Sequence, residues 1–530
     1  MKPPKPPNGA PPKSFISSVT EFYRSQIGGE SVINYAYTDF PWRLLAKDVY
    51  YFFVYCWALP WVLFPLRPFE SGELDELYPS RMNMFCLAVH FFLIIFQLVF
   101  LVTLPFAIFF PAWMGIAGVV GFHFLNKLIC MLLNGRSIIF HSDEKYAKPR
   151  PEHAHEQWIF LNGVSIGPSN LNRQLSEHWM KMNLNRLAIT FGRPILGIHN
   201  QTSGVIFDVI ECLIQRNFSY ATDDVRVCYK HLKDILYNPK KSKVVFIMHS
   251  QGAIEGGMVL DWLLQEMPQD LLAKLEVYTF GSAANHFNNP HRHVISQDLT
   301  RSRPLEAMQT LVSEAAYETP VTTPLEVMKD PMVTASLLRR SSSITSYHTA
   351  SAAKDRAIGH IEHYTHNTDF VAIWGILHFA TNKMAYLQLP RFLGRLFNRS
   401  NGHGGHLLVQ HYLDGMFPLK RNPETGEFIG ADENNAFMEE VIKVGIEGTA
   451  MENAREAFEI SYGGTGGFGT GEITTPIEVY DQFSTHRKHR TDVKVKELSR
   501  LWMYRNGLSP PEPSVVLAAE LVGMHRNSIF

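Results

Sequence analysis

The sequence predicts an α/β protein in which helices cover both faces of a mostly parallel sheet, with membrane helices preceding the sheet. Three observations lead to this fold class. Short apolar, strand-like runs alternate with helix-like periodicity between residues 157 and 280. Residues 82–126 contain no Asp, Glu, Lys or Arg. Finally, a strand-like run changes into a helix-like pattern at Ser250, which places this serine on a sharp turn.

Composition limits the classes of function. The 530-residue chain is 46% apolar and has a formal net charge of -1, so nothing indicates nucleic-acid binding. The five cysteines have no paired spacing, which argues against a disulfide framework or a zinc site and favours a reducing compartment. We expect no metal and no cofactor. Residues 1–40 begin with a polar, Pro-rich stretch and are expected to form a tail, with no signal peptide.

The uncharged run 82–126 is long enough for two membrane helices, since one crossing needs about 20 apolar residues. Pro105, Pro111 and Gly115 supply breaks near its middle, so the run is expected to form a hairpin. A buried soluble helix is the alternative, but the run exceeds what a core helix requires.

Basic residues flank both outer ends of this hairpin, Arg81 on one side and Lys127, Arg136 and Lys145 on the other. The excess of basic residues on the cytoplasmic side of membrane proteins then predicts a multi-pass protein with the globular domain that follows the hairpin in the cytosol.

An earlier aromatic run, Val49 to Leu66, is also uncharged and is flanked by Arg43, Lys47 and Arg67. Its tryptophans, tyrosines and prolines suit an interfacial or re-entrant segment. A buried soluble helix explains the run equally well, and both interpretations stay open.

The globular part of the chain alternates strands and helices. Strands are predicted at 157–162, 195–199, 244–248 and 275–280, and a further strand is predicted just before Asp369. Helices are predicted at 175–189, 207–214, 223–236 and 253–264. In a parallel sheet of this kind, functional side chains gather at the carboxyl ends of the strands.

The strand 244–248 and the following helix place Ser250 on a strand-to-helix turn within Met248-His-Ser-Gln-Gly252. This stretch resembles the nucleophile elbow Gly-x-Ser-x-Gly of the serine α/β-hydrolases, lipase and esterase branch. The resemblance extends from about Trp158 to Tyr412. Within the family, the chain resembles membrane-associated lipase-like hydrolases in particular. Met248 replaces the first glycine, which puts a large side chain where the turn usually has a small one.

The resemblance implies a chain order of nucleophile, acid and base. Asp369 follows a predicted strand in Asn-Thr-Asp-Phe-Val and is the expected acid, although an aspartate there also suits a helix N-cap. Glu362 and Asp355 remain as alternatives.

The expected base is His406, which follows two glycines and precedes an apolar stretch. In this family the histidine lies on a loop after the last strand. His411 is the second choice and His403 the third. The other histidines have no regular ligand spacing, so no metal cluster is expected.

The resemblance also implies two backbone N–H groups that hold the oxyanion. Gln251 follows the nucleophile, and Asn162-Gly163-Val164 lies in the loop after the first predicted strand of the globular part. We expect the N–H groups of Gln251 and Val164 to form the hole, with Gly163 allowing close approach of the substrate. A simple turn glycine is the alternative at Gly163.

The predicted function is that of a membrane-anchored serine hydrolase, a lipase or carboxylesterase of lipid metabolism, that cleaves acyl esters through Ser250, His406 and Asp369. The bilayer is the expected partner, and lipid esters are favoured as substrates only by this location. An inactive membrane adaptor with the same fold remains possible, as do an acyltransferase and a thioesterase, because the fold does not select among them.

The chain is expected to divide into four regions. These are the tail 1–40, a membrane-associated region 41–140, an α/β-hydrolase domain 150–425 with a disordered insertion at about 288–355, and a helical and Gly-rich extension 426–530. Within the extension, Asn434 to Phe458 is expected to be helical. The glycines 464, 466 and 469 match the spacing of a dinucleotide-binding loop, but no strand precedes them, which favours a linker.

Overall fold

The computed structural model describes eleven stretches of the chain, and all structural statements refer to them. They are residues 20–23, 39–134, 137–164, 178–294, 296–297, 311–312, 350–351, 355–381, 394–400, 404–443 and 492–510. Most of the expected insertion at 288–355, the glycine run at 464–469 and the alternative base His403 lie outside them.

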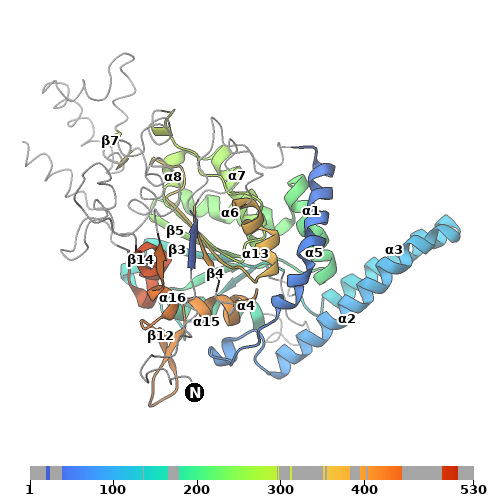
Figure 1. Ribbon diagram of the computed structural model, residues 1–530, viewed down its shortest axis with the longest axis horizontal. Helices are drawn as coiled ribbons and strands as arrows, with labels where there is room; N and C mark the ends of the chain where they lie inside the picture. The colour runs from blue at the N-terminus through green and yellow to red at the C-terminus, as the bar shows by residue number, and fades with distance from the viewer. Residues whose placement is uncertain are drawn as a thin grey trace, which may run out of the picture.

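The described residues form one large eight-stranded sheet in the order β1-β10-β9-β6-β5-β3-β4-β2 (Figure 1). The strands are β1 Thr20–Tyr23, β2 Ile139–His141, β3 Glu156–Leu161, β4 Ile195–Ile198, β5 Lys243–His249, β6 Leu275–Phe280, β9 His360–His366 and β10 Arg395–Arg399. The neighbours from β10 to β4 are parallel, whereas β1 and β2 pair antiparallel at the two edges. The predicted mostly parallel sheet is therefore confirmed.

The strand before Ser250, β5, lies in the centre of this sheet between β3 and β6. Val245 faces Trp158 of β3 and Glu276 of β6 in the register. Every residue of β5 except His249 is buried, which explains its uninterrupted apolar sequence, because helices cover both faces of a parallel sheet.

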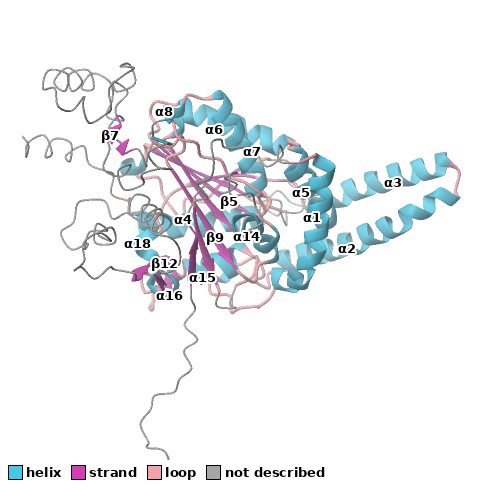
Figure 2. Cartoon of the chain, turned by 45° about the horizontal axis from the view of Figure 1, so that its top comes forward, coloured by secondary structure: helices cyan, strands magenta, loops and turns pink. Residues whose placement is uncertain are grey.

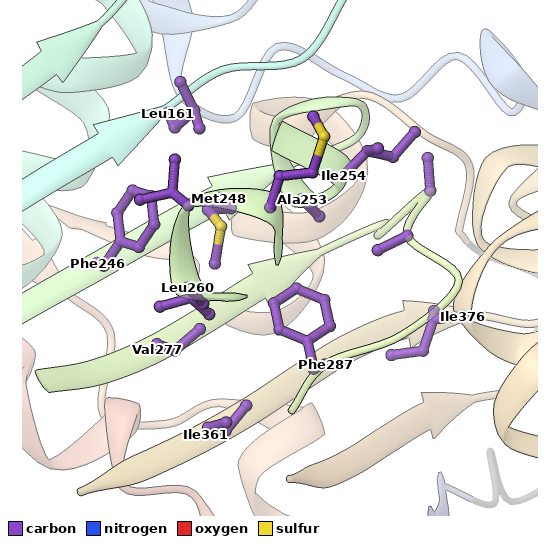
Figure 3. Close-up of a cluster of buried hydrophobic side chains, with 14 of the residues drawn as sticks. Leu161, Phe246, Met248, Ala253, Ile254, Leu260, Val277, Phe287, Ile361 and Ile376 are labelled. Atoms are coloured by element: carbon purple, nitrogen blue, oxygen red, sulfur yellow. The ribbon is translucent and has the colours of Figure 1, made fainter. Parts of the chain in front are cut away.

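Helices pack on both faces of the sheet. Their bounds are α4 His178–Phe191, α5 Val205–Phe218, α6 Asp223–Tyr237, α7 Gly252–Glu266, α8 Gln269–Leu272, α13 Phe370–Trp374 and α14 Ile376–Thr381. One core cluster joins α5, α6, α7 and α13 to the sheet, and another joins α4 and the C-terminal segments to the opposite face. Figure 3 shows part of the first, where Phe246 and Met248 of β5 lie near Leu260 of α7 and Val277 of β6.

Shorter elements complete the described fold. They are η3 Gly72–Leu74, η5 Pro151–His153, the π-helix η7 Leu408–Leu413, α15 Asp414–Met416, α16 Ala436–Glu439, α18 Val495–Leu498, η9 Leu501–Gly507, and the strand pairs β7 Leu311–Val312 with β8 Ala350–Ser351, β11 Leu419–Arg421 with β12 Phe428–Ala431, and β13 Val441–Lys443 with β14 Asp492–Lys494.

The predicted helix from Asn434 to Phe458 is present only at Ala436–Glu439 in its described part and is wrong beyond that point. The short helix α16 ends at Glu439, and β13 follows, paired with β14 from more than forty residues downstream. Glu440 binds the guanidinium of Arg399 at 3.0 Å. A local periodicity pattern contains no information on such long-range partners, which outweigh helix propensity here.

Segments outside residues 150–425 complete the same core. β1 and β2 form the two edges of the sheet. Near the C-terminus, Arg500 binds Glu276 of β6 at 2.8 Å, and Tyr504 donates to the same carboxylate at 2.8 Å. At the expected start of the insertion, Asn288 and Asn289 are buried and belong to the packed body.

The aromatic run Val49 to Leu66 forms the end of α1, Pro41–Tyr55, and the 3-10 helix η2, Cys56–Val62. One face of α1 packs on the body, where buried Asp48 pairs with Arg216 of α5 at 2.6 Å. The other face exposes large aromatic side chains, among them Tyr50, Phe53 and Trp57. The helix therefore begins before the uncharged run and combines features of both sequence-based interpretations.

The uncharged run 82–126 forms a helical hairpin that projects from the body (Figures 1 and 2). It consists of α2 Arg81–Thr103, η4 Leu104–Phe109 and α3 Ala112–Cys130. The turn therefore lies between Pro105 and Pro111, where the sequence predicted a break. By length and composition the two legs are apolar enough to cross a membrane, which is weak evidence for membrane association.

Candidate active site

Ser250 occupies the turn between β5 and α7 with φ = 58°, in the left-handed region that non-glycine residues seldom adopt. Its neighbours fix this backbone on both sides. The Ser250 N–H donates to the Phe280 carbonyl at 3.1 Å, and the Ser250 carbonyl accepts from the N–H groups of Ala253 at 3.1 Å and Ala283 at 3.2 Å. This combination gives the strained strand-turn-helix geometry of a nucleophile elbow.

Two glycines allow the loop after β3 to lie directly against this turn. A Cβ atom on Gly163 would come within 2.4 Å of the Ser250 Cβ and 2.8 Å of the Gln251 nitrogen. A Cβ on Gly252 would come within 2.6 Å of the Asn162 carbonyl oxygen. The close approach therefore requires glycine at both positions, and it brings Gly163 next to Ser250 as the sequence predicts.

The large side chain of Met248 fits beside the elbow because α7 has a glycine opposite it. Met248 is completely buried, and a Cβ atom on Gly256 would lie only 1.9 Å from its sulfur. The small residue that usually stands on the strand side of the motif is therefore replaced by one on the helix side, one turn beyond Gly252. The departure from the family motif is accommodated by packing and leaves the turn itself unchanged.

The structure brings together three of the residues singled out from sequence. The His406 Nε2 lies 2.8 Å from the Ser250 Oγ, and its Nδ1 lies 3.0 Å from the Asp369 Oδ2. His406 follows β10 on a loop, and Asp369 follows β9. All three are nearly buried, with Ser250 5% and His406 8% exposed. A serine hydroxyl, an imidazole and a carboxylate in this order form a proton-transfer chain.

Asp369 also has the second role that its sequence context allows. Its Oδ1 accepts the Val371 N–H at 2.8 Å and so caps α13, while its Oδ2 accepts the Tyr412 hydroxyl at 2.6 Å. Burial by itself raises the pKa of Asp369, but His406, together with the hydrogen bonds from Tyr412 and Val371, lowers the pKa below its ordinary value overall. Asp369 is thus held as a carboxylate facing His406.

His249, the residue before the nucleophile, supports the backbone of His406. Its Nε2 lies 2.9 Å from the His406 carbonyl oxygen, and the two rings stack with centroids 4.8 Å apart. Burial, followed by the nearby His406, lowers the pKa of His249 to about 3. His249 is therefore neutral near pH 7, and its Nε2–H donates to the carbonyl.

His411, the second-choice base, holds the loop of His406 and does not contact Ser250. Its Nδ1 accepts the Leu407 N–H at 2.9 Å, and its Nε2 donates to the Pro65 carbonyl at 3.0 Å. A Cβ atom on Gly405 would lie 2.5 Å from the Trp61 carbonyl oxygen. The segment that follows α1 thus lies directly against the loop that carries His406.

Glu76, from the linker between η2 and α2, holds the same loop from its other end. Its carboxylate accepts the N–H groups of Val409 at 2.8 Å and Gln410 at 3.3 Å, at the start of η7. Burial, followed by the nearby Asp75, raises the pKa of Glu76 to about 8. Either protonation state retains an acceptor oxygen for the helix terminus.

The alternative acids lie elsewhere. Glu362 points to the C-terminal segment, where it accepts from the N–H groups of Arg500 at 2.7 Å and Leu501 at 3.2 Å. Asp355 pairs with His293 at 2.9 Å. Neither carboxylate has a hydrogen bond to His406 among the described contacts.

Three carboxyl groups near the Gln251 side chain interact with one another and form the acidic cluster, defined as Glu211, Asp224 and Glu255. The amide of Gln251 donates to Glu211 at 3.1 Å, and Asn200 donates to Glu255 at 2.6 Å. Burial, and then the neighbouring carboxylates, raises the pKa of Glu211 to about 7 and that of Glu255 well above its usual range. Among the described residues, no group of His, Cys, Asp and Glu is arranged to hold a metal ion.

The proposed oxyanion donors lie next to the serine. Gln251 is the N-cap residue of α7, so its N–H points from the positive end of a helix. Val164 follows Gly163 on the loop that presses against the turn. Their role in holding an oxyanion stays a prediction.

Sequence reasoning missed three residues that hold the site. Tyr412 and His249 were within reach of it, because one follows the candidate base by six positions and the other precedes the nucleophile directly. Glu76 had no signal, since it lies more than 300 residues from the loop that it caps.

No protein-family model matches the sequence, and no curated protein is significantly similar to it. Solved structures are similar at low identity. An esterase from the archaeon Pyrobaculum calidifontis is 13% identical over 50% of this chain and 73% of its own, with a TM-score of 0.25. A lipase-esterase related protein from Clostridium acetobutylicum is 12% identical over 52% and 94%, with a TM-score of 0.21. An ester-hydrolase from the metagenome of Lake Arreo is 10% identical over 55% and 82%, with a TM-score of 0.22.

These scores are too low to support an argument about activity. The fold follows from the chain itself, because a central parallel strand ends in a strained serine turn, helices cover both faces, and Asp369 and His406 follow the later strands β9 and β10. The described part of the chain has the α/β-hydrolase fold of the esterases and lipases.

Proposed function

We propose that this protein is a membrane-anchored serine hydrolase that cleaves carboxylic esters of acyl groups. The observation that carries the proposal is the continuous chain of contacts from Ser250 Oγ to His406 at 2.8 Å and on to Asp369 at 3.0 Å, beside a strained turn at a helix N-terminus. A serine with a purely structural role would not need this combination of features.

In the first half of the reaction, His406 Nε2 takes the hydroxyl proton while Ser250 Oγ attacks the ester carbonyl carbon. Asp369 holds the imidazole with its Nδ1–H directed toward the carboxylate and stabilises the imidazolium. The oxyanion accepts hydrogen bonds from the N–H groups of Gln251 and Val164. His406 then returns its proton to the departing alkoxide, which leaves an acyl group on Ser250.

In the second half, a water molecule gives a proton to His406 and attacks the acyl-serine carbonyl. Collapse of this intermediate breaks the bond to Ser250 Oγ, which regains the proton from His406. The carboxylic acid leaves and the enzyme is restored. Tyr412, which donates to Asp369, and His249, which donates to the His406 carbonyl, keep the imidazole in one orientation through both halves of the reaction.

The proposed substrate is an acyl ester of a membrane lipid, and the proposed partner is the bilayer. The hairpin α2–α3 supplies the anchor, and its basic flanks favour a cytosolic catalytic domain. Both ends of the hairpin lie on one side, so the catalytic domain has the same location whether or not the hairpin crosses.

Met248 in the elbow motif would favour an inactive adaptor if its large side chain distorted the turn. Packing of its sulfur over Gly256 removes this argument, because the turn at Ser250 has its φ near 58° nonetheless. Thioester hydrolysis and acyl transfer would pass through the same acyl-enzyme. Assays with esters, thioesters and acyl acceptors are therefore needed to distinguish these reactions.

The proposal is tested by hydrolysis of p-nitrophenyl esters by the purified full-length protein in detergent. Ser250→Ala is expected to reduce turnover to background while the unfolding midpoint stays near that of the wild type. Ser242→Ala, at the other end of β5, is the matched control and is expected to keep full turnover. Equal turnover by the Ser250 variant would reject this serine as the nucleophile.

A further inference from the structure

The helical hairpin is fastened to the catalytic body part of the way along both legs. Gln97 of α2 donates to Asn126 of α3 at 2.9 Å and to the Ser203 carbonyl at 2.8 Å. Asn126 donates to the same carbonyl at 3.0 Å, and Gln97 accepts the Ile206 N–H at 3.2 Å. We call this group of contacts, between the side chains of Gln97 and Asn126 and the backbone of Ser203 and Ile206, the polar clamp. Beyond the polar clamp the hairpin projects from the body.

Below the polar clamp, one face of the hairpin packs on the body, whereas the other face of α2 exposes apolar side chains such as Phe91 and Phe92. The buried residues of α2 are Asn83, Cys86, His90, Leu93 and Gln97, and those of α3 are Asn126 and Cys130, so every one lies at or below the clamp. The side chain of Asn83 accepts from Trp179 of α4. One turn beyond the clamp, the ring of Phe122 of α3 lies against Phe207 of α5, which is the last ring contact of this leg with the body among the described residues. Only the stretch 98–125, the free arm, projects beyond the clamp (Figure 2).

The free arm exposes apolar side chains on all sides and contains no Asp, Glu, Lys or Arg. Val102, Ile108, Phe109, Trp113 and Phe124 are 66%, 83%, 79%, 69% and 69% exposed. A contiguous apolar surface of this extent marks a membrane or protein contact. Exposure around both legs, rather than along one stripe, fits a surrounding apolar medium such as the lipid of a bilayer.

The free arm is too short to cross a bilayer. At about 1.5 Å per residue, the α3 stretch from Ala112 to Leu125 rises about 20 Å. The other leg agrees, because Leu98–Thr103 is α-helical and Leu104–Phe109 is a 3-10 helix with a rise of about 2 Å per residue. The hydrocarbon layer is about 30 Å thick.

The turn of the hairpin also suits a position within lipid. Residues 104–113 read Leu-Pro-Phe-Ala-Ile-Phe-Phe-Pro-Ala-Trp, without the Gly, Asn, Asp or Ser that water-exposed turns prefer. Pro105 and Pro111 have no N–H group, and the Phe110 N–H donates to the Ala107 carbonyl at 3.1 Å. The turn therefore leaves few unpaired backbone donors, as hydrocarbon requires.

We propose that the hairpin enters the bilayer from one side and turns inside the hydrocarbon layer, so that the protein is monotopic and does not cross. The face next to the hairpin then lies in the membrane interface. There α1 exposes Tyr50 and Phe53, the following η2 exposes Trp57, and the neighbouring α5 exposes Ile210 and Phe218. Aromatic side chains are favoured at this depth. This proposal replaces the two crossings expected from length alone and does not depend on the proposed chemistry.

The experiment uses full-length protein in membrane vesicles and a membrane-impermeant maleimide. Cys56 is the exposed cysteine among the described residues and is replaced first, as Cys56→Ser. In this background, Phe110→Cys reports on the turn, and Lys240→Cys, on the exposed loop before β5, reports on the side of the catalytic domain. The reagent is supplied to one face in sealed vesicles and to both faces in vesicles that are opened without detergent.

We expect Lys240→Cys to be labelled from one face, and Phe110→Cys to be labelled from neither face until detergent dissolves the bilayer. Labelling of Phe110→Cys from the face opposite to Lys240→Cys would overturn the proposal. Labelling of both cysteines from the same face would also overturn it, because the arm would then lie outside the lipid.

A depth measurement gives a second, independent readout. A fluorophore attached to the turn cysteine in detergent, followed by reconstitution, is expected to be quenched most strongly by lipids brominated near the ends of their acyl chains. Strongest quenching by bromine near the far headgroups would contradict the inference. Ile108→Cys serves in the same way if Phe110→Cys does not fold. Ester hydrolysis is not used, so the outcome is separate from that of the proposed function.

Discussion

Two sets of carboxyl groups lie near the Ser250 turn, and their surroundings differ. In the first set, Asp369 faces the imidazole of His406 and the hydroxyl of Tyr412, and its pKa is lowered overall. In the second set, Glu255 and Glu211 of the acidic cluster face amides and each other, and their pKa values are raised. Glu255 and Asp369 are both completely buried, so burial alone does not account for the difference between their pKa shifts.

The comparison shows that the partner of a buried acid decides what the acid can do. Burial favours the neutral form, and only an opposite charge or several hydrogen-bond donors overcome this effect. Asp369 has such partners and remains charged, which orienting and stabilising an imidazolium requires. Glu255 lacks a cation and is held neutral, so it acts as a hydrogen-bonded part of the structure behind Gln251.

Asp369→Asn should have the largest effect on activity among the supporting residues. The amide keeps the shape of the side chain and can still cap α13, but it cannot stabilise the imidazolium of His406. We expect kcat to fall by about 10³ to 10⁴ with a small change in the unfolding midpoint. A steady-state assay with a soluble p-nitrophenyl ester measures this, and a loss below tenfold would remove Asp369 from its proposed role.

Glu76 tests whether the linker before α2 holds the loop of the base. Glu76→Ala removes both acceptors at the start of η7, and the resulting displacement of His406 should lower kcat by about 100-fold with KM nearly unchanged. Glu76→Gln keeps one acceptor oxygen and should recover most of the rate. If the glutamine variant were as impaired as the alanine variant, the hydrogen bonds to Val409 and Gln410 would not be the cause.

Gly256→Ala tests the packing that accommodates Met248. The added Cβ would meet the Met248 sulfur at 1.9 Å, and such overpacking costs about 1–3 kcal/mol. The better helix propensity of alanine offsets up to about 1 kcal/mol of this. Met248→Ala together with Gly256→Ala should regain stability relative to the sum of the single variants in urea unfolding. Strict additivity would show that the two residues do not interact.

Glu255→Gln tests the acidic cluster and should have the smallest effect. Because the folded pKa of Glu255 is raised, its stability contribution decreases as pH rises above its ordinary value near 4.3. The amide does not ionise and keeps an oxygen that can accept from Asn200. The decrease in Tm between pH 5 and pH 8 should therefore become smaller by a few degrees, with kcat nearly unchanged. An unaltered pH dependence of Tm would contradict a neutral Glu255.

Local sequence signals predicted the central sheet well. The predicted strand 275–280 coincides with β6, and the strand 244–248 lies within β5. These segments are buried on both faces, so a short apolar run with turns on each side is sufficient to identify them. Ser250, Asp369 and His406, which the structure brings together, were singled out for a related reason, because each follows a strand or its loop in the order that the family resemblance implies.

Long-range partners could not be predicted in this way. β13 forms because β14 pairs with it, and Glu76 caps η7 from a distant part of the chain. The sequence also does not show that Gly256 makes room for the large side chain of Met248. This pairing becomes visible only when β5 and α7 are packed together. The polar clamp on the hairpin is of the same kind, as hydropathy gives the length of an apolar run but not the point where it leaves the protein.

Covalent labelling by a fluorophosphonate probe tests the central claim most directly. The full-length protein in detergent is treated with the probe, digested, and analysed by mass spectrometry. The account predicts a single adduct on Ser250 in the wild type, none in Ser250→Ala, and much slower labelling in Asp369→Asn. Failure of folded wild-type protein to form this adduct, or an adduct on another serine that persists in Ser250→Ala, would contradict it.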